Sequence, residues 1–244
     1  MYLSHRTTLL AVVLLSPLPS LRTQTAADPS GHWEGAVHAP FGELGMEVDL
    51  AKNSKGELAG TYTNAEGNLK GFPLASVSVE GKSVRFVLKA GSGGGTFDGV
   101  LSAETKSISG DFLIGGNYVP FSLHRTGDAR MEATSKSPAI SKEIEGAWNG
   151  TLDVSGTKMR LELTMSNEPD GTSTGTVDLD GGLTIPIAAI RQKASDLTFE
   201  LKSVGASFSG VLNPERTALA GTYTEGPLTT PLTFERAVIK DKKK

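Results

Sequence analysis

The stretch Gly31-His32-Trp33-Glu34-Gly35 occurs a second time, in altered form, as Gly146-Ala147-Trp148-Asn149-Gly150. The two stretches hold the only two tryptophans of the chain. Each opens a segment of similar length, and the two segments match one another as far as Arg125 and Arg236, which stand in equivalent places. The sequence therefore predicts a tandem repeat of two domains.

The composition limits the classes of function. A chain of 244 residues has room for two domains, each with a small core. Its 24 basic and 27 acidic residues give a net charge of -3, so we expect no nucleic-acid partner. Cysteine is absent, which excludes disulfides, thiolate metal sites, a cysteine nucleophile and the lipid anchor of a bacterial lipoprotein.

Residues 1–27 have the features of a secretory signal peptide. His5 and Arg6 give a basic start, Leu9 to Leu15 an apolar centre, and Thr25-Ala26-Ala27 a cleavage site of small residues. The apolar run is too short to span a bilayer, so we expect no integral membrane segment after its removal. A buried first strand is the alternative. Export without cysteines favours a periplasmic or secreted bacterial protein.

Apolar and polar residues alternate in both halves, which is the period of a strand with one buried face. The apolar series of the first half are Leu44, Met46, Val48 and Leu50; Val84, Phe86 and Leu88; and Val119, Phe121 and Leu123. Those of the second half are Met159, Leu161, Leu163 and Met165; Leu197, Phe199 and Leu201; and Thr230, Leu232 and Phe234. A shift of one residue would invert every side chain, so the agreement between the halves supports this inward face.

The spacing of turn signals indicates about eight strands per repeat, with connections such as Asn53-Ser54-Lys55-Gly56 that are typical of hairpins. Inward apolar-Gly-apolar triplets, such as Phe97-Gly99-Leu101 and Phe208-Gly210-Leu212, are expected where a tightly curved sheet bends. The predicted fold class is all-β, with two tandem small antiparallel up-and-down β-barrels of about eight strands each. Two β-sandwiches are the alternative.

The predicted domain boundaries follow from the extent of the repeat. The first barrel repeat covers residues 28–127 and the second covers 144–238. Residues 128–143 have little apolar periodicity and are predicted to be a linker. Residues 239–244 form a basic tail that we expect to be solvated.

An arginine falls on the inward face of the last strand in each repeat, at Arg125 and Arg236. A guanidinium on an apolar face needs hydrogen-bond acceptors or an aromatic plane. If the first strand pairs with the last, Trp33 lies near Arg125 and Trp148 near Arg236. We therefore expect a cation stacked on an indole at one end of each barrel, in a structural role. Contact with a ligand is the alternative role.

These residues carry a resemblance to a known group. Gly31-His32-Trp33 with Arg125, and Gly146-Ala147-Trp148 with Arg236, resemble the two-part signature of the calycin barrels, which include lipocalins and avidins. In that group the Trp and Arg pack together across the closed end, so the resemblance implies the same role here.

The whole repeat also resembles an accessory domain found before the catalytic domain of some secreted bacterial serine and α/β-hydrolases. The shared features are Gly-x-Trp-x-Gly, a Pro before Leu or Ile at Pro73 and Pro186, Phe-x-Gly-x-Leu, and the closing Pro-Leu-x-Phe-x-Arg. No hydrolase domain follows the second repeat in this sequence, so the resemblance implies no hydrolytic activity.

Several residue sets contain side chains of the types that metal binding or catalysis needs. His32, Glu34 and His38 share the outward face of the first strand and could hold a metal, but the second repeat lacks both histidines. We therefore expect a solvated face, and no metal or cofactor. Asp98 with Asp111 is a candidate carboxylate pair, as is Asp178 with Asp180. Such residues near turns are usually solubilising.

No Gly-x-Ser-x-Gly elbow occurs; the nearest text, Gly205 to Gly210, has the wrong spacing. The glycine-rich Gly91 to Gly95 lacks the lysine and helix of a phosphate-binding loop. We therefore expect an exported, non-enzymatic binding or interaction protein that holds a small apolar ligand or a partner protein. The alternatives are a carbohydrate or cell-surface attachment module, an accessory subunit of a secreted hydrolase, and an unrecognised hydrolase.

Overall fold

The computed structural model describes residues 27–53, 55–89, 94–131, 136–154, 156–180 and 182–237. Within these ranges the chain forms two antiparallel sheets and no α-helix; a short 3-10 helix, η2, covers Lys202–Val204. Most of the predicted signal peptide and the whole basic tail lie outside the described residues.

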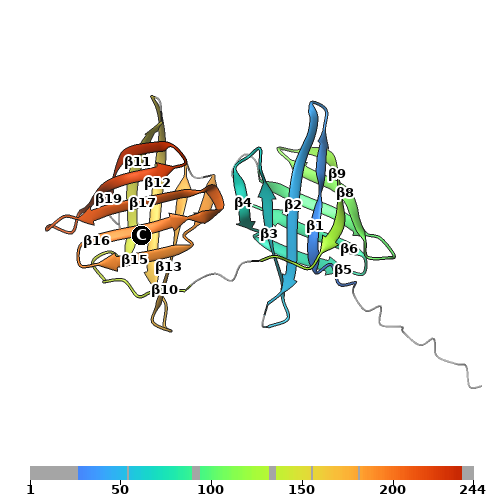
Figure 1. Ribbon diagram of the computed structural model, residues 1–244, viewed down its shortest axis with the longest axis horizontal. Coiled ribbons are helices and arrows are strands. Elements are labelled where there is room, and N and C mark those ends of the chain that lie inside the picture. The colour runs from blue at the N-terminus through green and yellow to red at the C-terminus, as the bar shows by residue number, and fades with distance from the viewer. Residues whose placement is uncertain are drawn as a thin grey trace, which may run out of the picture.

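The first sheet contains nine strands, which follow one another in the chain. They are β1 (Gly31–Ala39), β2 (Gly42–Lys52), β3 (Leu58–Asn64), β4 (Leu69–Pro73), β5 (Ser76–Glu80), β6 (Ser83–Leu88), β7 (Gly95–Leu101), β8 (Ser107–Ile114) and β9 (Asn117–Gly127). Their order in the sheet is β4-β3-β2-β1-β9-β8-β7-β6-β5. The first strand thus pairs with the last, and the sheet curls so that β1 to β4 lie in front of β5 to β8 in Figure 1.

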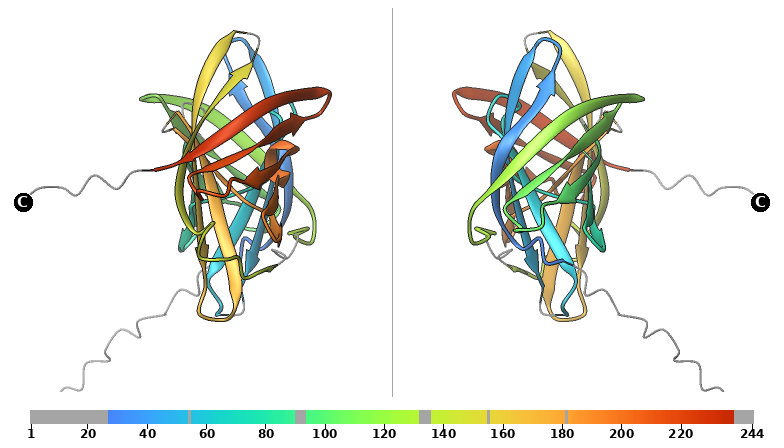
Figure 2. Two further views of the ribbon diagram at one scale, coloured as in Figure 1. Left: turned by 90° about the vertical axis from the view of Figure 1, so that its left-hand side faces the viewer. Right: turned by 90° about the vertical axis from the view of Figure 1, so that its right-hand side faces the viewer.

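The second sheet repeats this arrangement and adds a short strand, β10 (Ser137–Pro138). Its other strands are β11 (Gly146–Val154), β12 (Thr157–Asn167), β13 (Thr172–Leu179), β14 (Leu183–Pro186), β15 (Ala189–Lys193), β16 (Asp196–Leu201), β17 (Ala206–Leu212), β18 (Ala218–Glu225) and β19 (Leu228–Arg236). Here β11 pairs with β19. The further views in Figure 2 show the same curling of both sheets. The predicted class of two tandem antiparallel barrels is therefore confirmed.

Each repeat has nine strands where the sequence indicated about eight. In the first repeat the stretch around Leu74 forms two strands, β4 and β5. Proline has no amide hydrogen, so Pro73 ends the ladder of β4 on β3. The Leu74 amide then donates to the Gly60 carbonyl of β3 at 2.9 Å, and the Ala75 amide donates to the Val87 carbonyl of β6 at 2.8 Å. Two consecutive amides thereby join the two ends of the sheet. The residues after Pro186 do the same in the second barrel.

Beyond this junction β3 and β5 lie beside one another without sharing a hydrogen-bond ladder, whereas β13 and β15 are separated by β10. This line is termed the seam of each barrel. A closed barrel would leave no free strand edge. Both repeats depart from this prediction at the seam, and the two seams differ from each other.

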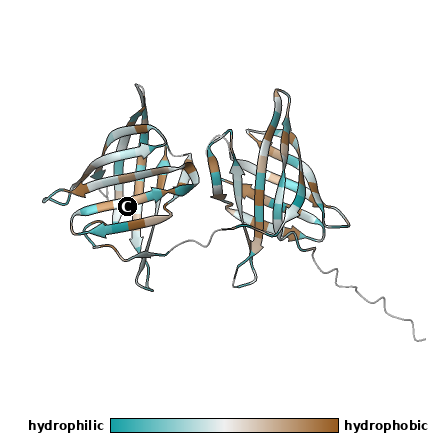
Figure 3. Ribbon diagram, in the orientation of Figure 1, coloured by the Kyte–Doolittle hydropathy of each residue, from teal (hydrophilic) through white to brown (hydrophobic). Residues whose placement is uncertain are grey.

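The core follows the predicted alternation. Inward residues such as Val48, Phe86, Leu123, Leu163 and Phe234 are at most 2% exposed, whereas most residues between the inward ones are polar. Figure 3 shows this alternation of hydrophobic and hydrophilic residues along the strands of both barrels. The inward face predicted from parity is therefore the buried face.

Residues 137–144 fall in and beside the predicted linker, and the structure places them on the second barrel. Ser137 and Pro138 form β10, which pairs with β13. Ile140 and Ile144 are 6% and 0% exposed. Earlier in the same segment, the Arg130 amide donates to a carboxylate of the first barrel. The connecting segment is therefore attached to both barrels at its described ends.

The barrels also touch through a turn. Asn68, between β3 and β4, donates from Nδ2 to the Val204 carbonyl and to Glu225 Oε1, each at 3.2 Å. Among the described residues, no helix has the length and hydropathy needed to cross a membrane.

Candidate functional site

The interior of the first barrel is filled by aromatic rings. Phe97 is stacked between Phe86 and Phe112, with ring centroids 4.6 and 4.0 Å away. Phe121 meets Phe97 edge to face at 5.2 Å. Rings in these arrangements are in direct contact, so they leave no gap between them for a ligand.

The inward glycines do not provide room either. Gly99 and Gly110 lie opposite each other on β7 and β8. A Cβ on Gly110 would lie 1.9 Å from the Asp98 carbonyl oxygen, and one on Gly99 would lie 2.9 Å from the ring of Phe121. The glycines therefore permit a close approach of backbone and ring, and the space beside them is occupied.

The second barrel is packed in the same way. Phe208 contacts Phe199 and Phe234, with ring centroids 5.1 and 5.2 Å away. Gly210 lies opposite Gly221, and a Cβ on Gly210 would lie 2.5 Å from the Phe208 ring. The aromatic rows and the glycines thus describe two filled barrels.

The structure brings Trp33 and Arg125 together at one end of the first barrel. They are direct partners in the pairing of β1 with β9, and Arg125 Cζ lies 4.7 Å from the centroid of the indole. Arg125 Nη1 donates to the Ser30 carbonyl at 2.5 Å and Nη2 to the Asp28 carbonyl at 3.0 Å. Trp33 Nε1 donates to the Pro29 carbonyl at 2.9 Å.

Trp148 and Arg236 repeat this geometry. Arg236 Cζ lies 4.1 Å from the indole centroid, and Nη1 donates to the Glu145 carbonyl at 3.1 Å. Nη2 donates to the Glu143 carbonyl, and Trp148 Nε1 donates to the Ile144 carbonyl at 2.8 Å. Both tryptophans are 0% exposed. In both pairs the guanidinium and the indole N–H donate to backbone carbonyls of this chain, which fits a structural role.

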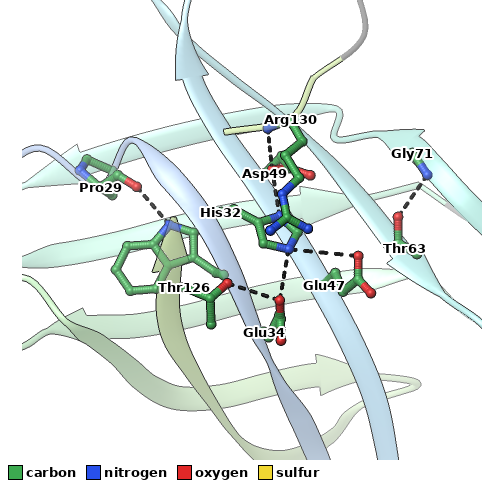
Figure 4. A network of polar contacts seen from close by, with 10 residues as sticks. Pro29, His32, Glu34, Glu47, Asp49, Thr63, Gly71, Thr126 and Arg130 are labelled. Atoms are coloured by element: carbon green, nitrogen blue, oxygen red, sulfur yellow. Dashed lines mark hydrogen bonds and ion pairs between the residues drawn. The ribbon is translucent and has the colours of Figure 1, made fainter. Parts of the chain in front are cut away.

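His32 lies on the side of β1 opposite to Trp33, yet it is only 1% exposed. Its Nδ1–H donates to Asp49 Oδ1 at 2.8 Å, and the same oxygen accepts the Arg130 amide at 2.7 Å. Nε2 lies 3.2 Å from Glu34 Oε1 and 4.0 Å from Glu47 Oε2, without a hydrogen bond of good geometry. Figure 4 shows this network and the Arg130 side chain directed toward the imidazole. The predicted solvated face is therefore wrong at His32.

His38 is not part of this group. Its Nδ1 lies 3.1 Å from Glu43 Oε1, and its Nε2 lies 2.9 Å from Ser122 Oγ on the exposed face. The described part of the chain contains no group of three or more His, Asp or Glu side chains placed to hold a metal. His32 and Asp49 hold the start of the segment that leaves the first barrel, because Asp49 Oδ1 accepts hydrogen bonds from both His32 and the Arg130 amide.

Asp98 and Asp111 lie opposite each other on β7 and β8. Three of the four candidate carboxylates have partners outside their pair. Asp98 accepts two hydrogen bonds from the Arg85 guanidinium, at 2.5 and 3.1 Å. Asp178 accepts the Thr184 hydroxyl, and Asp180 accepts the Arg160 amide at 2.9 Å. These contacts connect neighbouring strands and fit structural roles.

A cleft of about 570 Å³ lies along the seam of the first barrel. It is lined by the start of β3 and the turn before it, by β5, and by the first described residues: Ala27, Asp28, Pro29, Lys52, Gly56, Glu57, Leu58, Ser76, Val77, Ser78 and Val79. Leu58, Val77 and Val79 are half-buried, and the rim is polar. An apolar floor with a polar rim is typical of a binding groove.

One ion pair borders this cleft. Lys52 Nζ lies 2.8 Å from Asp28 Oδ2, and the Ser30 amide and hydroxyl donate to Asp28 Oδ1. The hydrogen bond from Lys52, with those from Ser30, lowers the pKa of Asp28 from its ordinary value of 3.8 to about 2. Lys52 is thereby held at the edge of the groove.

The sequence did not indicate this cleft. Its residues come from segments far apart in the chain, and none has an unusual type or spacing. One signal was available: residues 137–140 precede Trp148 within the chain, whereas the residues at the same spacing before Trp33 belong to the predicted signal peptide.

Comparisons with known proteins place the chain in no family. No family model matches it, and no curated protein matches it. One solved structure is that of a candidate outer membrane protein from Bacteroides fragilis. Its sequence is 13% identical to this chain, the match covers 85% of this chain and 97% of that chain, and the TM-score is 0.28. A DUF3598 family protein of unknown function from Nostoc punctiforme is 15% identical over 85% of this chain and 96% of that one, with a TM-score of 0.24. At these scores neither likeness bears on function.

Proposed function

We propose that this chain is an exported, non-enzymatic binding protein that recognises a partner polypeptide on the outside of its first barrel. The observation that carries the proposal is the cleft along the seam between β3 and β5. It joins an apolar floor to a strand edge, and edges of this kind pair readily with another chain.

Binding of a small apolar ligand inside a barrel is disfavoured. The stacked rings of Phe86, Phe97 and Phe112 occupy the centre of the first barrel, and Phe208 with Phe234 that of the second. A carrier would need an interior cavity of several hundred Å³. The filled interiors therefore support a function at the surface.

Attachment to carbohydrate is disfavoured for a similar reason. Trp33 and Trp148 are fully buried beneath Arg125 and Arg236, so neither offers an indole face to a sugar. A secreted hydrolase remains one class of partner, because the repeat resembles accessory domains of such enzymes.

Site-specific photo-crosslinking tests the proposal. A benzophenone side chain is introduced at Ser78, which is exposed on the rim of the cleft, in the full chain with its own leader in the cells that make it. Ser109, exposed on β8, gives the matched control. We expect polypeptide adducts from position 78 and none of the same mass from position 109.

Two results would contradict this function. One is an identical adduct pattern at both positions. The other is a stoichiometric, lipid-sized mass that accompanies the protein in native mass spectrometry, which would indicate a carrier.

A further inference from the structure

The second barrel fills its own seam with the segment that precedes β11. β10 pairs with β13, with Ser137 opposite Ser173 and Pro138 opposite Thr172. On the other side of the seam, Ser137 Oγ accepts the Ile190 amide of β15 at 2.8 Å. The segment therefore lies between the two strands and bonds to both.

Three more hydrogen bonds hold this segment. The Ala139 amide donates to the Gly171 carbonyl at 3.1 Å. The Asn167 carboxamide accepts the Ile140 amide and donates to the Ile140 carbonyl, each at 2.9 Å. Ile140 is 6% exposed, so its side chain adds an apolar anchor to the backbone contacts.

The first barrel has the corresponding positions. Leu58 pairs with Lys52 at the start of β3, as Ser173 pairs with Asn167 at the start of β13. Leu58 lines the cleft and is half-buried, whereas Ser173, beneath β10, is 4% exposed. Among the described residues, no segment of the first barrel takes the place of β10.

The edge of β5 has the same register as the edge of β15. Val77 pairs with Phe86 as Ile190 pairs with Phe199. In an antiparallel ladder the amides of successive residues point alternately toward and away from the neighbouring strand. The Ile190 amide points away from β16, to Ser137; the Val77 amide therefore points away from β6, into the cleft.

The sequence explains why the two seams differ. Ser137 and Pro138 precede Trp148 by the same spacing as Arg22 and Thr23 precede Trp33. Arg22 and Thr23 belong to the segment predicted to be removed on export. The exported chain would then lack its own residues for the first seam.

We propose that the seam of the first barrel binds an extended segment of a partner polypeptide in the way that residues 137–140 fill the second seam. The proposal rests on the function proposed above and names the chemistry of the partner. The segment carries a hydroxyl residue that accepts the Val77 amide, and a branched apolar residue three positions later, as in Ser137 to Ile140. Its backbone pairs with Leu58 and the turn before β3.

A second copy of this chain fits less well as the occupant. Its matching segment is already used, because Ser137 and Ile140 are 7% and 6% exposed within its own second barrel. The floor of the first groove is also more apolar, since Leu58 and Val79 stand where the second barrel has Ser173 and Gln192. This favours aliphatic side chains in the partner.

The absence of cysteine makes a test of register direct. The probe is the peptide Lys-Ser-Pro-Ala-Ile-Ser-Lys, copied from residues 136–142, with one cysteine in place of its first Ser or its Pro. The exported protein carries Leu58→Cys or Glu57→Cys. Directly opposed residues of two strands are about 5 Å apart at Cα, within disulfide range, whereas adjacent residues point to opposite faces.

We expect disulfides between Leu58→Cys and the peptide with cysteine at the Ser137 position, and between Glu57→Cys and the peptide with cysteine at the Pro138 position. The two exchanged combinations should give at least tenfold less product. Equal yields in all four combinations, or none above a scrambled peptide, would refute strand docking. Because cysteine is placed at two positions of the protein, the test does not depend on the folding of one variant alone.

A second measurement uses the unmodified peptide with a fluorescent label. Val77→Pro removes the amide that faces the cleft and leaves the ladder with β6 intact, so peptide affinity should fall at least tenfold while the thermal midpoint changes little. An unchanged affinity would contradict the proposal. If the peptide fails while Ser78 still gives polypeptide adducts, the binding function stands and the strand mode is wrong. Adducts with twice the mass of the chain would identify a second copy as the occupant.

Discussion

Arg236 lies over the indole of Trp148, with Cζ 4.1 Å from the ring centroid, and its three guanidinium nitrogens all donate to backbone carbonyls. Those carbonyls belong to Glu143 and Glu145, just before β11, and to Arg216 in the turn before β18. The side chain therefore connects the entry of β11 with the turn between β17 and β18. Arg125 stacks on Trp33 in the same way, with Cζ 4.7 Å from the ring centroid. It donates only through Nη1 and Nη2, to the carbonyls of Ser30 and Asp28, and its buried Nε has no hydrogen-bond partner.

Replacement of Arg236 by lysine should destabilise the second barrel. An ammonium cannot reach three carbonyls and stack on the indole at once, so we expect Arg236→Lys to lower the free energy of unfolding by about 2 kcal/mol. Arg191→Lys, at an exposed ion pair with Glu200, is the control and should have little effect. Urea titration followed by tryptophan fluorescence measures both. Equal losses would remove the special role of Arg236.

Alanine at Gly110 should be poorly tolerated. Its Cβ would lie 1.9 Å from the Asp98 carbonyl oxygen, so β7 and β8 must separate. We expect a loss of about 3 kcal/mol in the free energy of unfolding. Gly127→Ala is the control, because a Cβ there meets nothing within 4 Å. Similar stability of the two variants in chemical denaturation would show that the interior can relax around Gly110.

The residue at which a truncated chain begins should determine the thermal stability of the second barrel. A chain that begins at Lys136 keeps β10 and the buried Ile140, whereas one that begins at Ile144, the predicted boundary, loses both. We expect both chains to fold and the shorter one to melt at a lower temperature in calorimetry, because it loses apolar burial and backbone hydrogen bonds. Addition of a peptide of residues 136–142 should restore part of the loss. Identical melting of the two chains would mean that the segment contributes nothing.

The ion pair of Asp28 with Lys52 should make a small, pH-dependent contribution to stability. The pKa of Asp28 is about 2 in the folded protein and 3.8 ordinarily, so the contribution is complete above about pH 4 and is lost as the pH falls through 2. Both side chains are about half exposed, which limits the effect to under about 1 kcal/mol.

Wild type and Asp28→Asn should therefore differ in their denaturation midpoints at pH 6 and converge toward pH 2. Glu104→Gln, in an exposed turn, is the control. A difference that is independent of pH would exclude the carboxylate as its source.

Local pattern was sufficient for much of the architecture. Alternation along β2, β6 and β9 identified the inward face, because the period of a strand is a property of neighbouring residues. The positions of Trp33 and Arg125 near the two ends of one repeat, with equivalent positions for Trp148 and Arg236, led to a closed first-to-last pairing that the register shows. The burial of His32 was not predictable in this way, since Asp49 and Arg130 come from other segments.

The sequence by itself determined the repeat, the strand class and the buried face, because each depends on short-range periodicity or on the likeness of two segments. Only the tertiary structure decided that the inward glycines lie against rings or against the neighbouring backbone, and that β10 fills one seam while the other presents a cleft. Those features depend on which distant residues meet across the barrel wall. A pattern along the chain fixes the direction of a side chain, but contacts between distant strands determine what that side chain meets.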